Sequence, residues 1–181
     1  MSVFRKVLFL RGFLVRGTES PSFCIKYMIT KDIVKDIVVS AMKESTIFLV
    51  DVKVGNANRI SVTVDKPEGI TIEECANISR SIESGLNRDT EDFELEVSSP
   101  GLTEPFKVLE QYLKNCGRYV DVVKRDGQKV HGLLKYVDDN EITLEIKTKI
   151  REAGQKKAKT VLQTISIKFI DIKATRVAIT L

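Results

Sequence analysis

The stretch FELEVSSPGL, residues 93–102, decides how this chain is organised. Apolar and polar side chains alternate through its first half, which is the pattern of a half-buried antiparallel strand. The apolar face carries Phe93, Leu95 and Val97. The chain then reaches Pro100 and Gly101, and we expect a type II turn over residues 99–102 in which Gly101 takes the positive φ. The stretch therefore predicts a joint between two parts of the chain.

Upstream of the joint, the pattern predicts two helices and a hairpin. From Thr30, apolar residues recur at helical spacing as far as Met42. Two β-branched runs, 47–54 and 59–65, flank the turn-rich GNAN and predict a hairpin. A second helix follows Thr71, which forms a capping box with Glu74. With the strand at 93–97, these elements predict an α-β-β-α-β domain over residues 28–102, in which two helices cover one face of a three-stranded sheet.

Downstream of the joint, the sequence pattern changes to that of short strands. A connecting helix is expected within residues 103–117, with Phe106, Leu109 and Leu113 on its apolar side. Five short alternating segments with tight turns then predict a small closed β-barrel over residues 118–181. Gly132, inside the second of these segments, is expected to allow the bend that closure needs. The predicted fold class is therefore α+β, with two domains.

The cysteine content and the lack of long apolar runs limit the classes of protein to which this chain can belong. The three cysteines form no CxxC pair, and the single His131 cannot complete a zinc site with them, so we expect reduced thiols, no metal, no cofactor and a cytoplasmic location. No apolar run approaches the roughly 20 residues that cross a bilayer, so no membrane attachment is expected. Residues 1–27 imitate a signal peptide, but Arg11 interrupts their apolar stretch. We interpret them as a dispensable leader outside the fold, with Met28 as a candidate start.

Charge is divided unevenly along the chain. Residues 1–26 carry a net charge of +4, residues 27–102 a net charge of −6, and residues 103–181 a net charge of +6. Such asymmetry predicts two surfaces with different partners. Six basic side chains gather between the third and fourth predicted barrel strands, on what we expect to be a loop: Lys147, Lys149, Arg151, Lys156, Lys157 and Lys159. No aromatic residue lies among them, which suits contact with RNA phosphates rather than base stacking. The alternative is a solvated loop without a partner.

The sequence motifs that could indicate a catalytic site are weak in this chain. A nucleophilic serine needs a base, and His131 is predicted to lie partly buried on a strand of the other domain, while no GxSxG surrounds Ser98 or Ser99. We expect Ser99 to accept hydrogen bonds within the turn. Residues 65–69, DKPEG, lack the glycine spacing of a phosphate loop and are interpreted as a connection between strand and helix. The acidic side chains around them are expected to form a solvated face or to receive a basic protein, and not to bind a metal: Glu73, Glu74, Glu94 and Glu96.

The motifs LVDVKV, VTVDKPEGITIEECANISRSI and LEVSSPGL, in this order and at this spacing, resemble the ribosome maturation factor RimP family. The resemblance is strong over residues 48–102 and looser through the predicted barrel. It implies an N-terminal α/β domain followed by an Sm-like five-stranded barrel. It also implies a non-enzymatic cytoplasmic factor, expected to be a monomer, that binds the immature small ribosomal subunit through rRNA and a basic ribosomal protein and promotes its maturation.

The residues carried over from the family motifs are called here the family-motif surface. They are Asp65, Lys66, Pro67, Glu68, Gly69, Glu96, Ser98, Ser99, Pro100, Gly101 and Leu102. Glu104 departs from the family pattern, which more often has a basic residue there, so an anion contact at that point is not expected. Two other interpretations stay open: a free-standing Sm-like RNA-binding regulator that forms rings, and an enzyme with an unrecognised site. A KH-type RNA module is disfavoured because the chain has no GxxG in its first domain.

Overall fold

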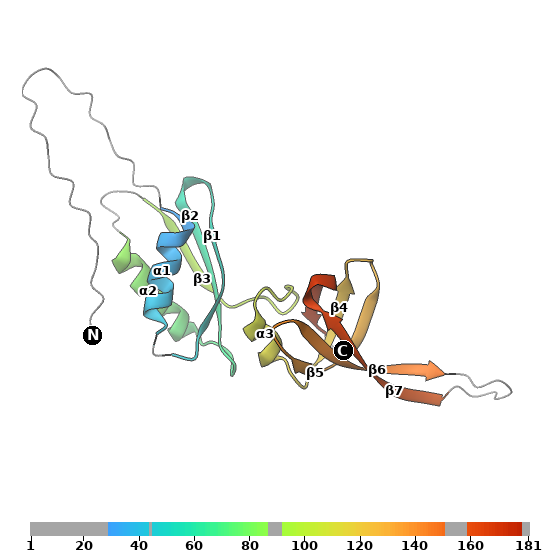
Figure 1. Cartoon of the computed structure of the whole chain (residues 1–181). Helices are drawn as coiled ribbons and strands as arrows, with labels where there is room; N and C mark the ends of the chain where they lie inside the picture. The colour runs from blue at the N-terminus through green and yellow to red at the C-terminus, as the bar shows by residue number, and fades with distance from the viewer. Residues whose placement is uncertain (1–28, 44, 87–91, 151–158, 179–181) are drawn as a thin grey trace, which may run out of the picture.

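The computed structural model describes residues 29–43, 45–86, 92–150 and 159–178, and it has two β-sheets that follow one another along the chain (Figure 1). The expected leader at residues 1–27 lies outside the described residues. Within the described ranges, none of the helices combines the length and the apolar character needed to cross a membrane.

The first sheet has three strands in the order β1 (Phe48–Val54), β2 (Arg59–Asp65) and β3 (Glu94–Ser98). β1 and β2 form the expected antiparallel hairpin, whereas β3 pairs with β2 in parallel. The expectation of an antiparallel strand at 93–97 is therefore wrong. A helix returns the chain along the sheet before β3 begins, and such a strand-helix-strand crossover places its two strands in parallel.

Two helices, α1 (Lys31–Ala41) and α2 (Ile72–Gly85), lie on the same face of this sheet, as expected (Figure 1). The Thr30 hydroxyl caps α1, and the predicted capping box between Thr71 and Glu74 starts α2. Both helices turn a single apolar stripe toward the strands, and the buried side chains form one cluster. Its fully buried members include Val34, Val38, Ile60, Val62, Val64 and Ile82. Among the described residues, no helix packs on the opposite face of this sheet.

The second sheet has five antiparallel strands. They are β4 (Tyr119–Lys124), β5 (Lys129–Val137), β6 (Glu141–Ile150), β7 (Lys159–Lys168) and β8 (Ile172–Val177). Their order in the sheet is β7-β6-β5-β4-β8. The Asp126-Gly127 pair makes the β4–β5 turn, where Gly127 has a φ of +88°. This sheet has its own buried cluster, which includes Val120, Val122, Leu134, Ile142 and Leu144.

The expected closed barrel is wrong, because β7 and β8 are the edges of an open sheet. β6 and β7 pair over ten positions, from Glu141 opposite Lys168 to Ile150 opposite Lys159. β4 and β8 have only six residues each. A barrel needs strands whose lengths and stagger match, and this hairpin is too long for its neighbours. It extends away from the first sheet instead (Figure 1).

The joint also differs from its prediction. Gly101 does not have a positive φ, and the turn lies two residues later, where the Glu104 N–H donates to the Gly101 carbonyl at 3.0 Å. The connecting helix is α3 (Leu109–Lys114), shorter than the range that was expected to contain it. Because the helix begins only at Leu109, Tyr112 faces the second core and Leu113 points outward, 51% exposed. The turn predicted over residues 99–102 from Pro100 and Gly101 is therefore replaced by a turn over residues 101–104, which the Glu104 N–H closes.

Gly132 has a different role from the expected bend. A Cβ atom there would lie 2.9 Å from the Glu145 carbonyl oxygen and 2.9 Å from Ile146 Cγ2. The absence of a side chain therefore lets β6 approach β5 closely. The irregularity of the β5–β6 pairing lies further along, between Leu134 and Tyr136.

We expect Gly132→Ala to lower the free energy of unfolding by about 1–3 kcal/mol, because the backbone of β6 would have to move. Gly101→Ala is the matched control. Its added Cβ would meet only the flexible Glu104 side chain at 3.4 Å, so a change within about 0.5 kcal/mol is expected. Urea unfolding of both variants checks this. Equal stabilities would show that the close approach at Gly132 is not a constraint.

Candidate functional site

The helix α3 is anchored to the second sheet by aromatic contacts. The Tyr112 ring meets Phe106 edge-on, with centroids 4.9 Å apart, and meets Phe169 edge-on at 5.1 Å. The Phe106 N–H also donates to the Thr175 carbonyl on β8 at 2.8 Å. Gln111 caps the start of the helix, where its side-chain oxygen accepts from the Lys107 N–H at 2.7 Å. α3 and the segment just before it therefore belong structurally to the second sheet and are held in place by it.

Two basic side chains, Lys114 on α3 and Lys107 just before it, form ion pairs with the first sheet. Lys114 Nζ lies 2.7 Å from Asp65 Oδ1, and this pair is nearly buried, with 14% and 8% of the two side chains exposed. Lys107 Nζ donates to Asp51 Oδ2 at 2.8 Å. Asp65 ends β2 and Asp51 lies in the middle of β1, so the two ion pairs attach α3 and the segment before it to two strands of the first sheet.

Neighbouring lysines stabilise the negative charge of Asp51. Burial acts to raise the pKa of its carboxyl, but the hydrogen bond and charge of Lys107, together with the charge of Lys31, outweigh burial and hold the pKa below its ordinary value. Asp51 is therefore ionised at neutral pH and available to Lys107.

The DKPEG motif places Asp65 at this contact. β2 ends at Asp65, and its carboxylate also accepts from the Lys66 N–H at 2.8 Å. A tight turn follows, closed by the Gly69 N–H donating to the Lys66 carbonyl at 3.0 Å, and Gly69 has a φ of +95°. Pro67 suits the second position of such a turn. The motif is therefore a strand-to-helix connection, as predicted, and it also supplies the buried carboxylate.

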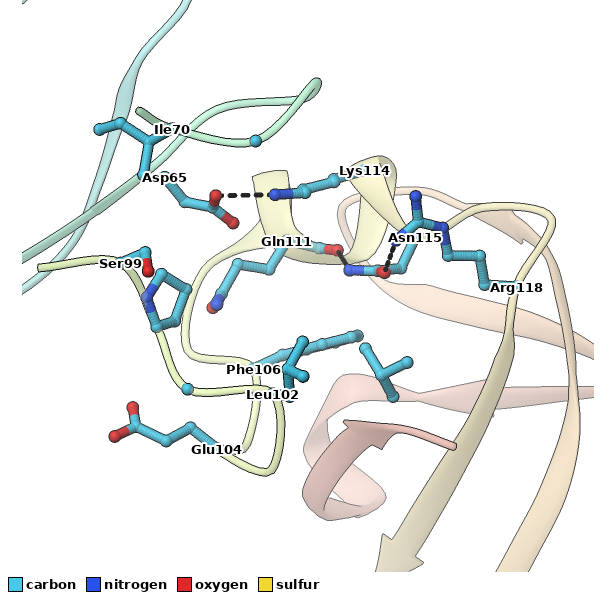
Figure 2. Close-up of a pocket in the computed structure, with 14 residues that line it drawn as sticks. Asp65, Ile70, Ser99, Leu102, Glu104, Phe106, Gln111, Lys114, Asn115 and Arg118 are labelled. Atoms are coloured by element: carbon cyan, nitrogen blue, oxygen red, sulfur yellow. Dashed lines mark hydrogen bonds and ion pairs between the residues drawn. The ribbon is translucent and has the colours of Figure 1, made fainter. Parts of the chain in front are cut away.

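A pocket lies between the two sheets at this point, with a volume of about 240 Å³ (Figure 2). Six residues of the family-motif surface line it: Asp65, Gly69, Ser99, Pro100, Gly101 and Leu102. The second sheet contributes Lys114 and Arg118 from the other side. The two motifs are thus brought together although 29 residues of sequence separate Gly69 from Ser99.

The remaining members of the family-motif surface lie outside this pocket. Lys66, Pro67 and Glu68 form the turn beside it, whereas Glu96 and Ser98 lie on β3. Glu96 is exposed and pairs in register with Ser61, and Ser98 pairs with Thr63, on the face that no helix covers. The family-motif surface is therefore a pocket with an adjoining polar sheet face.

The geometry suits binding better than catalysis. Ser99 lines the pocket between the sheets, whereas His131 lines hollows on the second sheet. Asp65 and Lys114 neutralise each other, which leaves Arg118 and Glu104 as the pocket's exposed charges. Leu102, 78% exposed, adds an apolar contact point at its rim. Such a lining can hold part of a polypeptide or polynucleotide.

The predicted basic loop is shorter than expected. β6 continues to Ile150 and β7 begins at Lys159, so Lys147, Lys149 and Lys159 belong to paired strands. The expectation that all six side chains share a loop is wrong for these three, since the strands pair further than the sequence pattern indicated. Arg151, Lys156 and Lys157 lie outside the described residues.

His131 is more exposed than predicted. Its side chain is 57% exposed, and its Nδ1 donates to Asp121 Oδ1 at 2.8 Å. The ring stacks on that of Tyr119, with planes 4° apart and centroids at 5.4 Å. Lys147 Nζ lies 6.0 Å from the centre of the Tyr119 ring. The sequence pattern missed this cluster because its members come from three strands.

Comparison with known proteins agrees with the motifs. Residues 37–103 match the family model of the RimP N-terminal domain. The chain is similar to a ribosome maturation factor RimP of Porphyromonas gingivalis, with 38% identity over 146 residues, which cover 81% of this chain and 96% of that protein. A ribosome maturation factor RimP of Christiangramia forsetii is 36% identical over 138 residues, covering 76% and 90%. One of Flavobacterium psychrophilum is 39% identical over 119 residues, covering 65% and 77%.

We expect the Asp65–Lys114 pair to behave as a buried pair in a double-mutant cycle. Asp65→Asn or Lys114→Met alone leaves one charge unpaired in a nearly buried place, which costs up to about 3–5 kcal/mol of unfolding free energy. The double variant should cost less than the sum of the two. The exposed pair Arg59–Glu94, with 74% and 69% of the side chains accessible, is the control, and its replacement by alanines should change stability by about 0–1 kcal/mol. Additive costs at Asp65 and Lys114 would mean that the pair does not couple the sheets.

Acid should weaken the start of α2 through Glu74. The hydrogen bond from the Thr71 N–H, followed by that from Lys66, lowers the pKa of this carboxyl from 4.5 to about 2. A folded-state pKa below the unfolded one gives stability that is present above the unfolded value and is lost as the pH falls from about 4.5 toward 2. Glu74→Gln keeps a capping side chain without the charge, so it should lose less stability than the parent between about pH 5 and pH 2.5. Urea unfolding midpoints of the parent and of Glu74→Gln, measured across that pH range, test this prediction. Midpoints that fall in parallel for the two proteins would contradict it.

Proposed function

The chain belongs to the ribosome maturation factor RimP family, and we propose from this that it is a cytoplasmic assembly factor that binds the immature small ribosomal subunit and promotes its maturation. The observation that carries the proposal is the convergence of both family motifs on one pocket, which α3 of the second sheet completes. A surface built from both parts of the chain suits a factor that must contact two components of a particle at once.

We propose a division of labour between two domains, residues 28–102 and 118–181, joined by residues 103–117. The first carries net negative charge over 27–102 and the second net positive charge over 103–181. Glu94 and Glu96 are exposed on β3, on the face that no helix covers. This face would receive a basic ribosomal protein, because opposite charges steer and orient such encounters.

The proposed rRNA contact lies on the β6–β7 hairpin and on the segment between its strands. Its members would be the six basic residues Lys147, Lys149, Arg151, Lys156, Lys157 and Lys159. Lys147 is exposed on β6, and the hairpin projects from the rest of the sheet, where it can reach a phosphate backbone (Figure 1). Binding of this kind needs no covalent chemistry, and the separation of Ser99 from His131 supports a factor that is not an enzyme.

The resemblance to the family implies an Sm-like second domain, and this supports the proposed RNA contact although the sheet is open. A free-standing Sm-like RNA-binding regulator is the alternative. It would bind isolated RNA and form rings through its sheet edges, whereas an assembly factor must bind the subunit as a monomer.

Sedimentation of cell extract through a sucrose gradient tests the proposal. We expect the full chain to co-migrate with free small subunits and to be absent from fractions of complete ribosomes. Glu96→Lys should reduce this co-migration through like-charge repulsion at the protein contact. The matched control is Asp36→Lys, which reverses the same charge on the exposed side of α1 and should change nothing. A chain that stays at the top of the gradient would favour the free-standing regulator.

A further inference from the structure

The open end of the second sheet leaves part of its core uncovered. β7 and β8 do not pair, and a groove of about 480 Å³ lies where β5, β6 and β7 come together. Its floor includes Val130, Ile146 and Ile165, which are only partly buried at the margin of the second core. Apolar side chains left at such a margin gain stability when a ligand covers them. We call this hollow the open-end groove.

The rim of the open-end groove is positively charged. Three lysines line it, Lys124, Lys129 and Lys147, and its lining contains no acidic side chain. Lys124 donates to Gln128 Oε1 at 2.9 Å. Among the described residues, none of the three lysines has a carboxylate partner. The rim therefore carries positive charges that no carboxylate of the described residues pairs with, and it suits a polyanion.

An aromatic plane stands at the edge of the same groove. The ring of His131 lines it and stacks on the parallel ring of Tyr119. The hydrogen bond to Asp121 holds the ring from its edge at 2.8 Å. A ring fixed in this way loses little conformational freedom when a second flat group stacks on it.

The groove continues past His131. A second hollow of about 370 Å³ shares Lys129, Val130 and His131 with it and adds Arg176. Arg176 pairs in register with Asp121, whose carboxylate is already engaged by His131. The two hollows therefore form one path with cations along it and the fixed ring in the middle.

We infer that the open-end groove binds single-stranded RNA, with one unpaired base stacked on His131 and the flanking phosphates at Lys129 and Lys147. An acidic peptide would satisfy the lysines but has no flat group for the ring, whereas every base has a π-face. Bases of a duplex are stacked on one another and are not available. The inference rests on the proposed function for its choice of RNA, and it adds a base-binding site to a hairpin that was expected to contact phosphates alone.

Fluorescence anisotropy with the full chain and a labelled single-stranded RNA of about ten nucleotides tests the inference. Lys129→Gln with Lys147→Gln should flatten the dependence of log affinity on log salt by about 1.4, since each lost phosphate contact on a single strand contributes about 0.7. The matched control is Lys35→Gln with Lys173→Gln, which removes the same charge from exposed positions on α1 and β8 and should leave the slope nearly unchanged.

Stacking of a base on His131 is tested separately, with two variants of that residue and with an abasic oligonucleotide. His131→Leu should weaken binding about 5- to 100-fold, whereas His131→Phe, which keeps a ring, should retain most of the affinity. An abasic oligonucleotide of equal length should bind about as weakly to the parent as intact RNA binds to His131→Leu. Equal affinity for intact and abasic strands, displacement by polyglutamate at equal charge concentration, or an unchanged salt slope in the double lysine variant would each overturn the inference.

The same variants in the sucrose gradient separate this inference from the proposed function. If the parent binds subunits but shows no groove-dependent oligonucleotide binding, the open-end groove is not an RNA site and the assembly role stands. If the parent binds oligonucleotide through the groove but never binds subunits, the site stands and the assembly role fails.

Discussion

The ion pair between Asp65 and Lys114 is the contact on which the arrangement of this molecule depends. A carboxylate at the end of β2 that is only 8% exposed requires a cation close by, because an unpaired charge in such a place costs several kcal/mol. Lys114 can supply that cation only if α3 is held firmly, and the edge-on contacts of Tyr112 with Phe106 and Phe169 hold it. The family motifs, the connecting helix and the second core are therefore linked through one buried charge pair. The pocket between the sheets follows from that linkage (Figure 2).

A second constraint is the unequal length of the strands in the second sheet. The ten-position pairing of β6 with β7 exceeds what β4 and β8 can match, so the sheet stays open and part of its core is exposed at one end. Openness would be a liability in a protein without partners, since an uncovered apolar margin promotes association. Here the margin is rimmed by lysines and carries a fixed ring, which gives it the composition of a binding site rather than of a packing defect.

These two constraints give the proposed assembly factor two separate surfaces of different chemistry. The pocket between the sheets is nearly neutral, with an exposed leucine and an adjoining polar sheet face that exposes Glu96, and suits a protein component. The open end of the second sheet is cationic and suits RNA. Because both surfaces belong to parts that the ion pairs of Lys107 and Lys114 attach to each other, contact at one surface constrains where the other can reach.

Local sequence patterns alone predicted a large share of this structure. Helical spacing after Thr30, the Thr71–Glu74 capping box and the paired β-branched runs depend on neighbours within a few residues, so they could be predicted without tertiary structure, and the motifs around DKPEG and VSSPGL placed the chain in its family. Tertiary structure decided everything that depends on distant residues. The parallel pairing of β3, the open sheet and the placement of Leu113 each resulted from packing between elements, whereas Gly101 differed because a local turn closed by the Glu104 N–H replaced the predicted one. The partners of Asp65 and His131 were hidden for the same reason: Lys114 lies 49 residues from Asp65 along the chain, and the pairing of three strands brings Tyr119, His131 and Lys147 together.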